Sequence, residues 1–155
     1  VALSTAKGIA YSLETPIIGV STLEIEAYPF ASTVLPVCPV HDAARGELAV
    51  AVYEQCESDW LCIIKEHLTS VDDLCNFTKK KTVFCGEIPE SVACQLTQCF
   101  GDKAVIPEEP ARMRYARHLA TLGWSRLQQR ETDDIATLQP IYLRRPHITT
   151  PKSKI

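Results

Sequence analysis

The chain has 155 residues, of which 46% are hydrophobic and 23% are charged, and its formal net charge is −3. This length suits one domain or two small lobes, and the composition excludes a disordered chain. The slightly negative charge excludes a uniformly basic, nucleic-acid-binding surface, so any contact with RNA must be local or made through a partner. No apolar run approaches the ~20 residues that cross a bilayer.

The chain opens with a predicted helix over residues 1–14. Its apolar side chains recur at helical spacing, and alanines make up much of the stripe. Because small side chains let another helix approach closely, Ala2, Ala6, Ile9 and Leu13 are candidate partner-interface residues. The alternative is that this face packs only against the chain's own sheet.

A short strand and a second helix are predicted next. Pro16 ends the first helix, and the apolar run over residues 17–20 predicts a short buried strand. Ser21 is the expected N-cap of a helix that extends to about Ala31. Glu24, three residues further on, would complete a capping box.

Three strands follow in the middle of the chain. Residues 34–40 have strand character but include Pro36 and Pro39, so we expect this strand to be irregular or to lie at an edge. Residues 47–55 and residues 60–65 predict a pair of antiparallel strands.

The next elements alternate between helix and strand. They are a short helix capped by Ser70, a buried strand over 82–86, a helix from Pro89 to about Phe100 and a short strand over 104–106. This succession predicts an α/β chain with a mixed sheet and flanking helices.

The last part of the chain begins with the longest predicted helix, over residues 109–129. The arginines around His118 on this helix are more typical of a solvated basic face than of an RNA contact; they are Arg112, Arg114 and Arg117. A proline-punctuated segment over 138–145 follows, and we expect the basic tail over 147–155 to be flexible.

Seven cysteines occur at irregular spacings and include no C-x-x-C pair, which excludes a zinc ribbon and a thioredoxin-type motif. Several lie in apolar runs, where a thiol behaves as a small buried hydrophobe. We therefore expect reduced cysteines in a cytoplasmic protein, with a disulfide framework as the alternative.

The sequence shows no catalytic, metal-binding or cofactor-binding set. A phosphate-binding loop, a nucleophile elbow and an H-E-x-x-H motif are all missing. His41 and Asp42 are adjacent and point apart, so they are not half of a triad. Asp42 is better explained as a turn residue before Gly46. We expect no catalytic residue, no metal and no cofactor.

Four motifs, in this order, resemble the TsaB proteins, also called YeaZ, which are shorter paralogues of the glycoprotease-like (peptidase M22-named) TsaD proteins. They are KGIA at residues 7–10, P-x-x-G-V-S-T-L-E at 16–24, D-A-A-R-G-E at 42–47 and P-x-Y-L-R at 140–144. The motif residues singled out are Ser21, Thr22, Leu23, Glu24, Asp42, Arg45, Gly46, Glu47, Tyr142, Leu143 and Arg144. Ala44 stands where the family has an arginine, and Arg45 follows one step later.

The resemblance implies an actin-like/RNase H-like (ASKHA-type) fold. The family's opening strand and its glycine-rich stretch have no counterpart here, so we expect the first lobe to be incomplete. The expected division is a first-lobe remnant over 1–31, a second lobe over 32–108, a C-terminal helix with the P-x-Y-L-R segment over 109–146, and the tail over 147–155.

The resemblance also implies a role. TsaB-like proteins resemble inactive copies of TsaD that pair with it through a helical bundle of the first lobes, to which residues 1–14 correspond. With the ATPase TsaE, the pair installs threonylcarbamoyl on a tRNA adenosine, so tRNA would be met indirectly, through the complex. The alternatives are a glycoprotease-like metallopeptidase and a homodimeric interaction module that uses the same helix face.

Overall fold

A mixed five-stranded sheet forms the centre of the protein in this computed structural model, which describes residues 1–57, 59–77, 80–108 and 114–144. The strand order is β3-β2-β1-β4-β5. The strands are β1 (Val37–Asp42), β2 (Leu48–Cys56), β3 (Asp59–Thr69), β4 (Thr82–Cys85) and β5 (Ala104–Val105). β1, β2 and β3 pair antiparallel, whereas β4 pairs parallel with both β1 and β5. The expected mixed sheet and its hairpin are confirmed.

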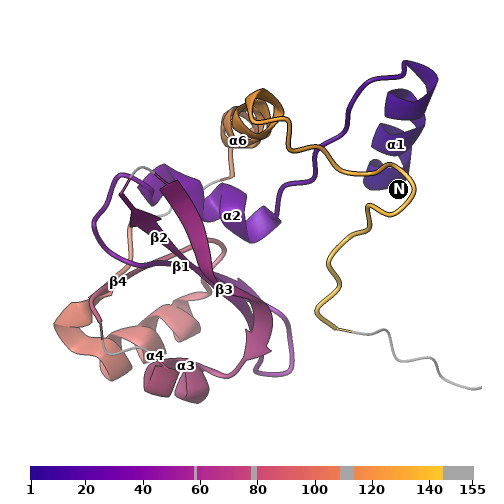
Figure 1. Cartoon of the computed structure of the whole chain (residues 1–155). Helices are drawn as coiled ribbons and strands as arrows, with labels where there is room; N and C mark the ends of the chain where they lie inside the picture. The colour runs from indigo at the N-terminus through magenta and orange to yellow at the C-terminus, as the bar shows by residue number, and fades with distance from the viewer. Residues whose placement is uncertain (58, 78–79, 109–113, 145–155) are drawn as a thin grey trace, which may run out of the picture.

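Helices cover both faces of the sheet, and α1 stands apart from it (Figure 1). They are α1 (Ala2–Ser12), α2 (Thr22–Ala27), α3 (Val71–Phe77), α4 (Glu90–Phe100) and α6 (Ala116–Gln128), with 3-10 turns at Tyr28–Phe30 and Gly101–Lys103. The predicted helix over 109–129 is therefore shorter at its start: residues 114–115 are not helical, and 109–113 lie outside the described residues. The predicted tail over 147–155 also lies outside them. No helix in the described ranges has the length and apolar character to cross a membrane.

Two buried clusters fill the faces of the sheet. The larger one packs α3 and α4 against β1, β2 and β4; its members include Val40, Val50, Leu74, Phe84, Leu96 and Phe100. The other packs α2 on the opposite face; its members include Leu23, Ala27, Val37, Ala51 and Tyr53. Alternation of side chains along each strand supplies both clusters from the same strands.

β1 is a central strand, so the expectation of an edge strand was wrong. It lies between β2 and β4, and its first four residues are buried. Pro39 is tolerated because the paired positions between β1 and β2 skip from Val37 to Val40. The missing N–H of Pro39 therefore falls at an interruption of the ladder.

The predicted strand over 17–20 is also absent. One isolated antiparallel bridge joins Ile17 to Asp133. The helix after it is shorter than expected, because α2 gives way at Tyr28 to a 3-10 turn that contains Pro29. Ser21 is the N-cap residue by position, but its side chain makes no capping hydrogen bond.

A disulfide joins Cys75 of α3 to Cys99 of α4, which corrects the expectation that the cysteines are reduced. Both residues belong to helices that cover the same face of the sheet, and this contact could not be inferred from their spacing of 24 residues. Among the remaining cysteines, Cys38 and Cys85 are buried as expected. Burial raises the pKa of Cys38 to about 12.

Replacing both Cys75 and Cys99 with serine is expected to lower the free energy of unfolding by about 3 kcal/mol, because the cross-link closes a loop of intermediate length in the unfolded chain. Urea unfolding with and without a reductant measures this. Cys94→Ser is the control, since Cys94 is an exposed free thiol on the same helix as Cys99. A wild-type protein whose stability does not respond to the reductant would contradict the prediction.

Candidate partner interface and adjoining cavity

The outer face of α1 is exposed. Ile9 and Leu13 are 56% and 66% exposed, and Ala2 and Ala6 are exposed beside them. The other side of the helix is covered, with Ala10 buried and Leu3 half-buried. The four candidate interface residues thus share one uncovered face, as their spacing predicts. We call Ala2, Ala6, Ile9 and Leu13 the α1 face.

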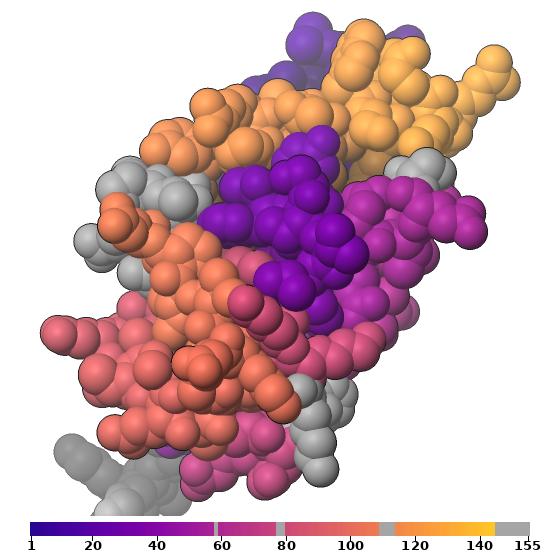
Figure 2. All heavy atoms as spheres, turned by 90° about the vertical axis from the view of Figure 1, so that its left-hand side faces the viewer, coloured from indigo at the N-terminus to yellow at the C-terminus, as the bar shows by residue number. Residues whose placement is uncertain are grey.

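The covered side of α1 lies against the C-terminal segment, which we define as residues 133–144 (Figure 1). The Nζ of Lys7 donates to the carbonyl oxygens of Leu138 and Ala136, at 3.0 and 3.4 Å. In the space-filling view, α6 and the C-terminal segment form a continuous band above α2 (Figure 2). The C-terminal segment therefore holds α1 in position.

The segment between α1 and α2 is held by two residues from the end of the chain. The backbone N–H of Asp133 donates to the carbonyl of Ile17 (2.9 Å), and the N–H of Gly19 donates to Oδ2 of Asp133 (2.6 Å). The carbonyl of Gly19 accepts from Nη1 of Arg126 at 2.8 Å.

Glu24 and Arg126 form an ion pair that joins α2 to α6, in which one guanidinium nitrogen contacts both carboxylate oxygens. The Nη2 of Arg126 lies 2.8 and 2.7 Å from the two carboxylate oxygens of Glu24, whose residue is 8% exposed. Hydrogen bonds between charged groups are shorter and stronger than those between neutral groups. The expected capping box is therefore wrong: Glu24 serves a tertiary contact.

The hydroxyl of Ser21, which was expected to cap α2, instead interacts with the hydroxyl of Tyr53 on β2. Burial is the main reason why the pKa of Tyr53 is raised, and the neighbouring Cys62 and Glu66 raise it further. Tyr53 therefore stays protonated and is available as a hydrogen-bond partner.

Glu26, on α2, has a fully buried carboxylate between a histidine and an arginine. Its Oε2 lies 2.5 Å from Nε2 of His41 on β1. Its Oε1 lies 3.1 Å from Nε of Arg114 but makes no hydrogen bond within the described residues, so this contact is purely ionic. Arg114 also contacts Glu87 at 2.5 Å. Arg114 is thus part of a salt-bridge network, contrary to the expected solvated basic face.

The D-A-A-R-G-E motif forms the turn between β1 and β2. Oδ1 of Asp42 accepts from the backbone N–H of Ala44 at 2.7 Å, which confirms Asp42 as a turn residue. Ala44, Arg45 and Gly46 all have positive φ values. Glu47 pairs with Arg144 from the C-terminal segment, so two of the resembling motifs meet here.

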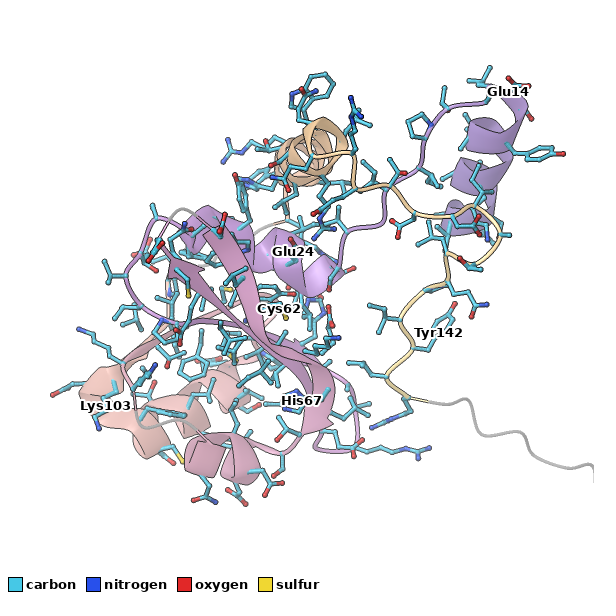
Figure 3. The ribbon with its side chains drawn as sticks, viewed as in Figure 1. Glu14, Glu24, Cys62, His67, Lys103 and Tyr142 are labelled. Carbon is cyan, nitrogen blue, oxygen red and sulfur yellow. A yellow bond between two sulfur atoms is a disulfide. The ribbon has the colours of Figure 1, made fainter. Side chains whose placement is uncertain are left out.

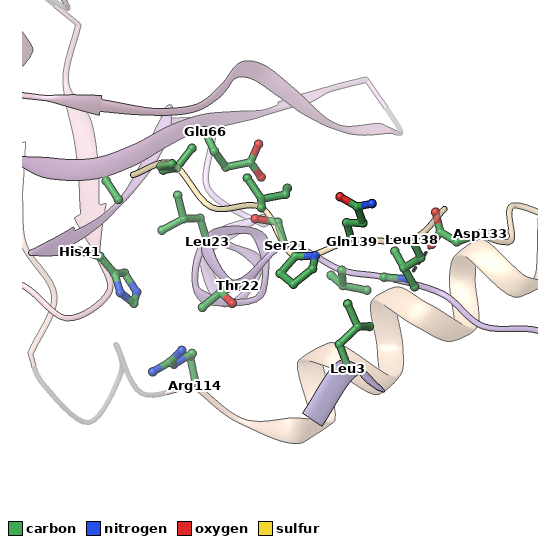
Figure 4. Close-up of a pocket in the computed structure, with 16 residues that line it drawn as sticks. Leu3, Ser21, Thr22, Leu23, His41, Glu66, Arg114, Asp133, Leu138 and Gln139 are labelled. Carbon is green, nitrogen blue, oxygen red and sulfur yellow. Dashed lines mark hydrogen bonds between the residues drawn. The ribbon is translucent and has the colours of Figure 1, made fainter. Parts of the chain in front are cut away.

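A cavity of about 650 Å³ lies where these parts converge (Figure 4). The motif residues that line it are Ser21, Thr22, Leu23 and Leu143, and Leu3, His41, Glu66, Arg114 and Asp133 join them. Both polar and apolar groups therefore face the cavity. Within the described ranges, no three His, Cys, Asp or Glu side chains lie close enough together to hold a metal ion.

The structure places the predicted motif residues in several different surroundings: four line the cavity, and the others lie in the turn between β1 and β2, in ion pairs or at the surface. Tyr142 is 79% exposed and projects from the C-terminal segment (Figure 3). Sequence reasoning missed Glu26, Arg126 and Asp133, and it missed the contacts, though not the presence, of Lys7 and Arg114. Their partners are distant in the chain, and no local spacing signals such contacts.

Comparison with known proteins identifies the family. A family model described as TsaD, tRNA N6-adenosine threonylcarbamoyltransferase, matches residues 1–152. No curated protein matches the chain. Two solved structures from Pseudomonas aeruginosa are similar in fold: YeaZ, with a TM-score of 0.72 and 18% identity, and an uncharacterized protein with similarity to peptidase YEAZ, with 0.70 and 17%.

Each of these comparisons covers 92% of this chain and 66% of the other, so the chain spans just under two thirds of either YeaZ-type structure. The likeness supports the expected actin-like/RNase H-like fold. Since the family model covers nearly all of the residues, the chain belongs to the TsaD family and has the fold of YeaZ.

Proposed function

We propose that this chain is a non-catalytic, TsaB-type partner subunit of the complex that installs threonylcarbamoyl on a tRNA adenosine. It would form a heterodimer with a TsaD-type catalytic subunit, work together with a TsaE-type ATPase and meet tRNA through that complex. The family match and the YeaZ fold support this role.

One observation carries the proposal: the α1 face is apolar, built of small and aliphatic side chains, and uncovered along its length. Its orientation is fixed from the other side by Lys7 and the C-terminal segment. An exposed apolar helix face suits packing against a partner helix. The alanines let the two backbones approach closely.

Ala6→Arg is expected to abolish co-elution with a TsaD-type subunit in size-exclusion chromatography at micromolar concentration, because it places a charge in the centre of the apolar contact. Ser4→Arg is the matched control. Ser4 is exposed on the opposite side of α1, so this variant adds the same charge without touching the α1 face. Circular dichroism checks that both variants keep the fold.

If the Ala6→Arg and Ser4→Arg variants co-elute equally with the TsaD-type subunit, the α1 face is not part of the contact. The role itself is tested by reconstitution with the TsaD-type subunit and the TsaE-type ATPase. Formation of threonylcarbamoyladenosine in tRNA should depend on adding this chain, and the chain should form none by itself. Modification by the chain alone would show that it is an enzyme.

A further inference from the structure

A second cavity, of about 900 Å³, lies between α6, the joined ends of β2 and β3, and the segment that follows α2. No residue lines both this cavity and the one beside α1, so the two are separate. Its volume is typical of clefts that take a ligand. We call this second cavity the α6 cavity.

The α6 cavity carries negative charge. Its lining includes the carboxylates of Glu57, Asp59 and Glu131, and all three residues are exposed. Within the described ranges, none of the three forms an ion pair. Among the described residues that line the cavity, the single cation is Arg126, which is already paired with Glu24. The charges of the three other carboxylates are therefore left uncompensated.

Apolar side chains also line the α6 cavity. Leu122 of α6 is 7% exposed, and the half-buried ring of Trp60 stacks on Tyr53 with 5.6 Å between the ring centroids. The other apolar lining residues are Tyr28, Ala31, Val34 and Leu61. A fitting ligand thus needs positive charge together with aliphatic or planar surface, which the side chains of arginine and lysine combine.

Other classes of ligand fit the α6 cavity less well. Within the described ranges, no three His, Cys, Asp or Glu side chains lie close enough together to hold a metal ion. RNA would bring phosphates to a surface that already carries uncompensated carboxylates. The buried Nε1 of Trp60 has no hydrogen-bond acceptor among the described residues. The carbonyl of a peptide would supply one, whereas a polyamine has no oxygen to accept with.

We propose that the α6 cavity binds an arginine-bearing segment of a partner protein. Guanidinium groups of the segment pair with the carboxylates of Glu57, Asp59 and Glu131, and its apolar parts pack against Trp60 and Leu122. Arginine suits the site better than lysine, because its planar guanidinium binds a carboxylate through two donors and stacks on an aromatic ring. None of these residues belongs to the α1 face, so the segment and a TsaD-type subunit use different surfaces.

Fluorescence anisotropy of a labelled peptide, Arg-Leu-Arg-Leu-Arg with both ends capped, tests the inference on the chain alone. We expect saturable binding of this peptide and none of Gln-Leu-Gln-Leu-Gln. Spermidine, a polyamine with the same number of positive charges, should displace the labelled peptide much less effectively than the unlabelled peptide does. Failure of the arginine peptide to bind, or equal displacement by spermidine, overturns the inference.

Neutral, isosteric replacements locate the contact. The triple variant Glu57→Gln/Asp59→Asn/Glu131→Gln should raise the dissociation constant of the arginine peptide about tenfold or more, because each exposed pair contributes modestly. The matched control changes three exposed carboxylates on the elements that cover the opposite face of the sheet. It removes the same charge and should leave the constant nearly unchanged; the variant is Asp72→Asn/Glu90→Gln/Asp102→Asn. Equal weakening by both triple variants would mean that only net charge matters, which overturns the inference.

The two tryptophans give a reading that needs no variant. On addition of the arginine peptide, the indole N–H signal of Trp60 should shift in the NMR spectrum, whereas that of Trp124, which does not line the cavity, should stay in place. Peptide binding without a shift at Trp60 overturns the inference. Because every measurement uses this chain without the TsaD-type subunit, the proposed function stands or falls separately.

Discussion

Replacing Arg126 with alanine is expected to lower the free energy of unfolding by about 3 kcal/mol, because it leaves the nearly buried carboxylate of Glu24 without its counter-charge. The same change removes the hydrogen bond to the carbonyl of Gly19, so α6 loses two of its ties to the segment around α2. Denaturant unfolding followed by tryptophan fluorescence measures the loss.

The double variant Glu24→Gln/Arg126→Ala separates lost attraction from an uncompensated buried charge. With a neutral amide at position 24, we expect the double variant to regain roughly 1–2 kcal/mol relative to Arg126→Ala. Arg117→Ala on the outer side of α6 is the control and should change stability by no more than about 0.5 kcal/mol. No recovery in the double variant would show that Glu24 is solvated after all.

The sequence predicts best the elements that carry their own periodic signal. β2, β4 and α4 were expected within about a residue of their bounds, whereas β3 was predicted over 60–65 and continues to Thr69. β1 was misplaced at an edge because the rule for proline assumes an unbroken ladder. Here the paired positions of β1 and β2 skip Cys38 and Pro39 without a change of register, which the residues of β1 alone do not reveal.

Residues 17–20 were predicted to form a strand, and they do not form one. Their composition is that of a buried strand, and composition alone supported the prediction. A strand also needs a neighbour, and here Asp133 supplies a single bridge to Ile17. The strand propensity of these residues is high, but a strand forms only where a neighbouring strand is available to pair with it.

In the candidate site too, the features with a local sequence signal were predicted, and the contacts between distant residues were not. The exposed face of α1 follows from helical spacing, and the turn role of Asp42 follows from residue type. The contacts that position α1, α2 and α6 join residues a hundred or more positions apart: Lys7 donates to carbonyls of the C-terminal segment, and Glu24 pairs with Arg126. From the sequence, Glu24 was expected to contact the start of its own helix in a capping box. In the structure it pairs instead with Arg126 of α6.

Gly86→Ala is expected to lower the free energy of unfolding by about 4 kcal/mol, through backbone strain and overpacking of roughly 1–3 kcal/mol each. Gly86 follows β4 with a φ of +91°, which L-residues rarely adopt. A Cβ there would lie 2.8 Å from the carbonyl oxygen of Val40 and 2.8 Å from Oε2 of Glu26. Val40 is in the central strand, so its backbone cannot move aside without disturbing the sheet.

Gly46→Ala is the matched control, because Gly46 has a similar φ of +76° but nothing within 4 Å of an added Cβ. It should show the conformational effect alone, on the order of 1 kcal/mol. The difference between the two variants in denaturant unfolding therefore measures how tightly Glu26 and β1 pack around Gly86. Equal losses for Gly46→Ala and Gly86→Ala would mean that the Glu26–His41 contact yields to the new methyl group. In that case His41 would shift at the edge of the cavity, which a change in its imidazole NMR signals would reveal.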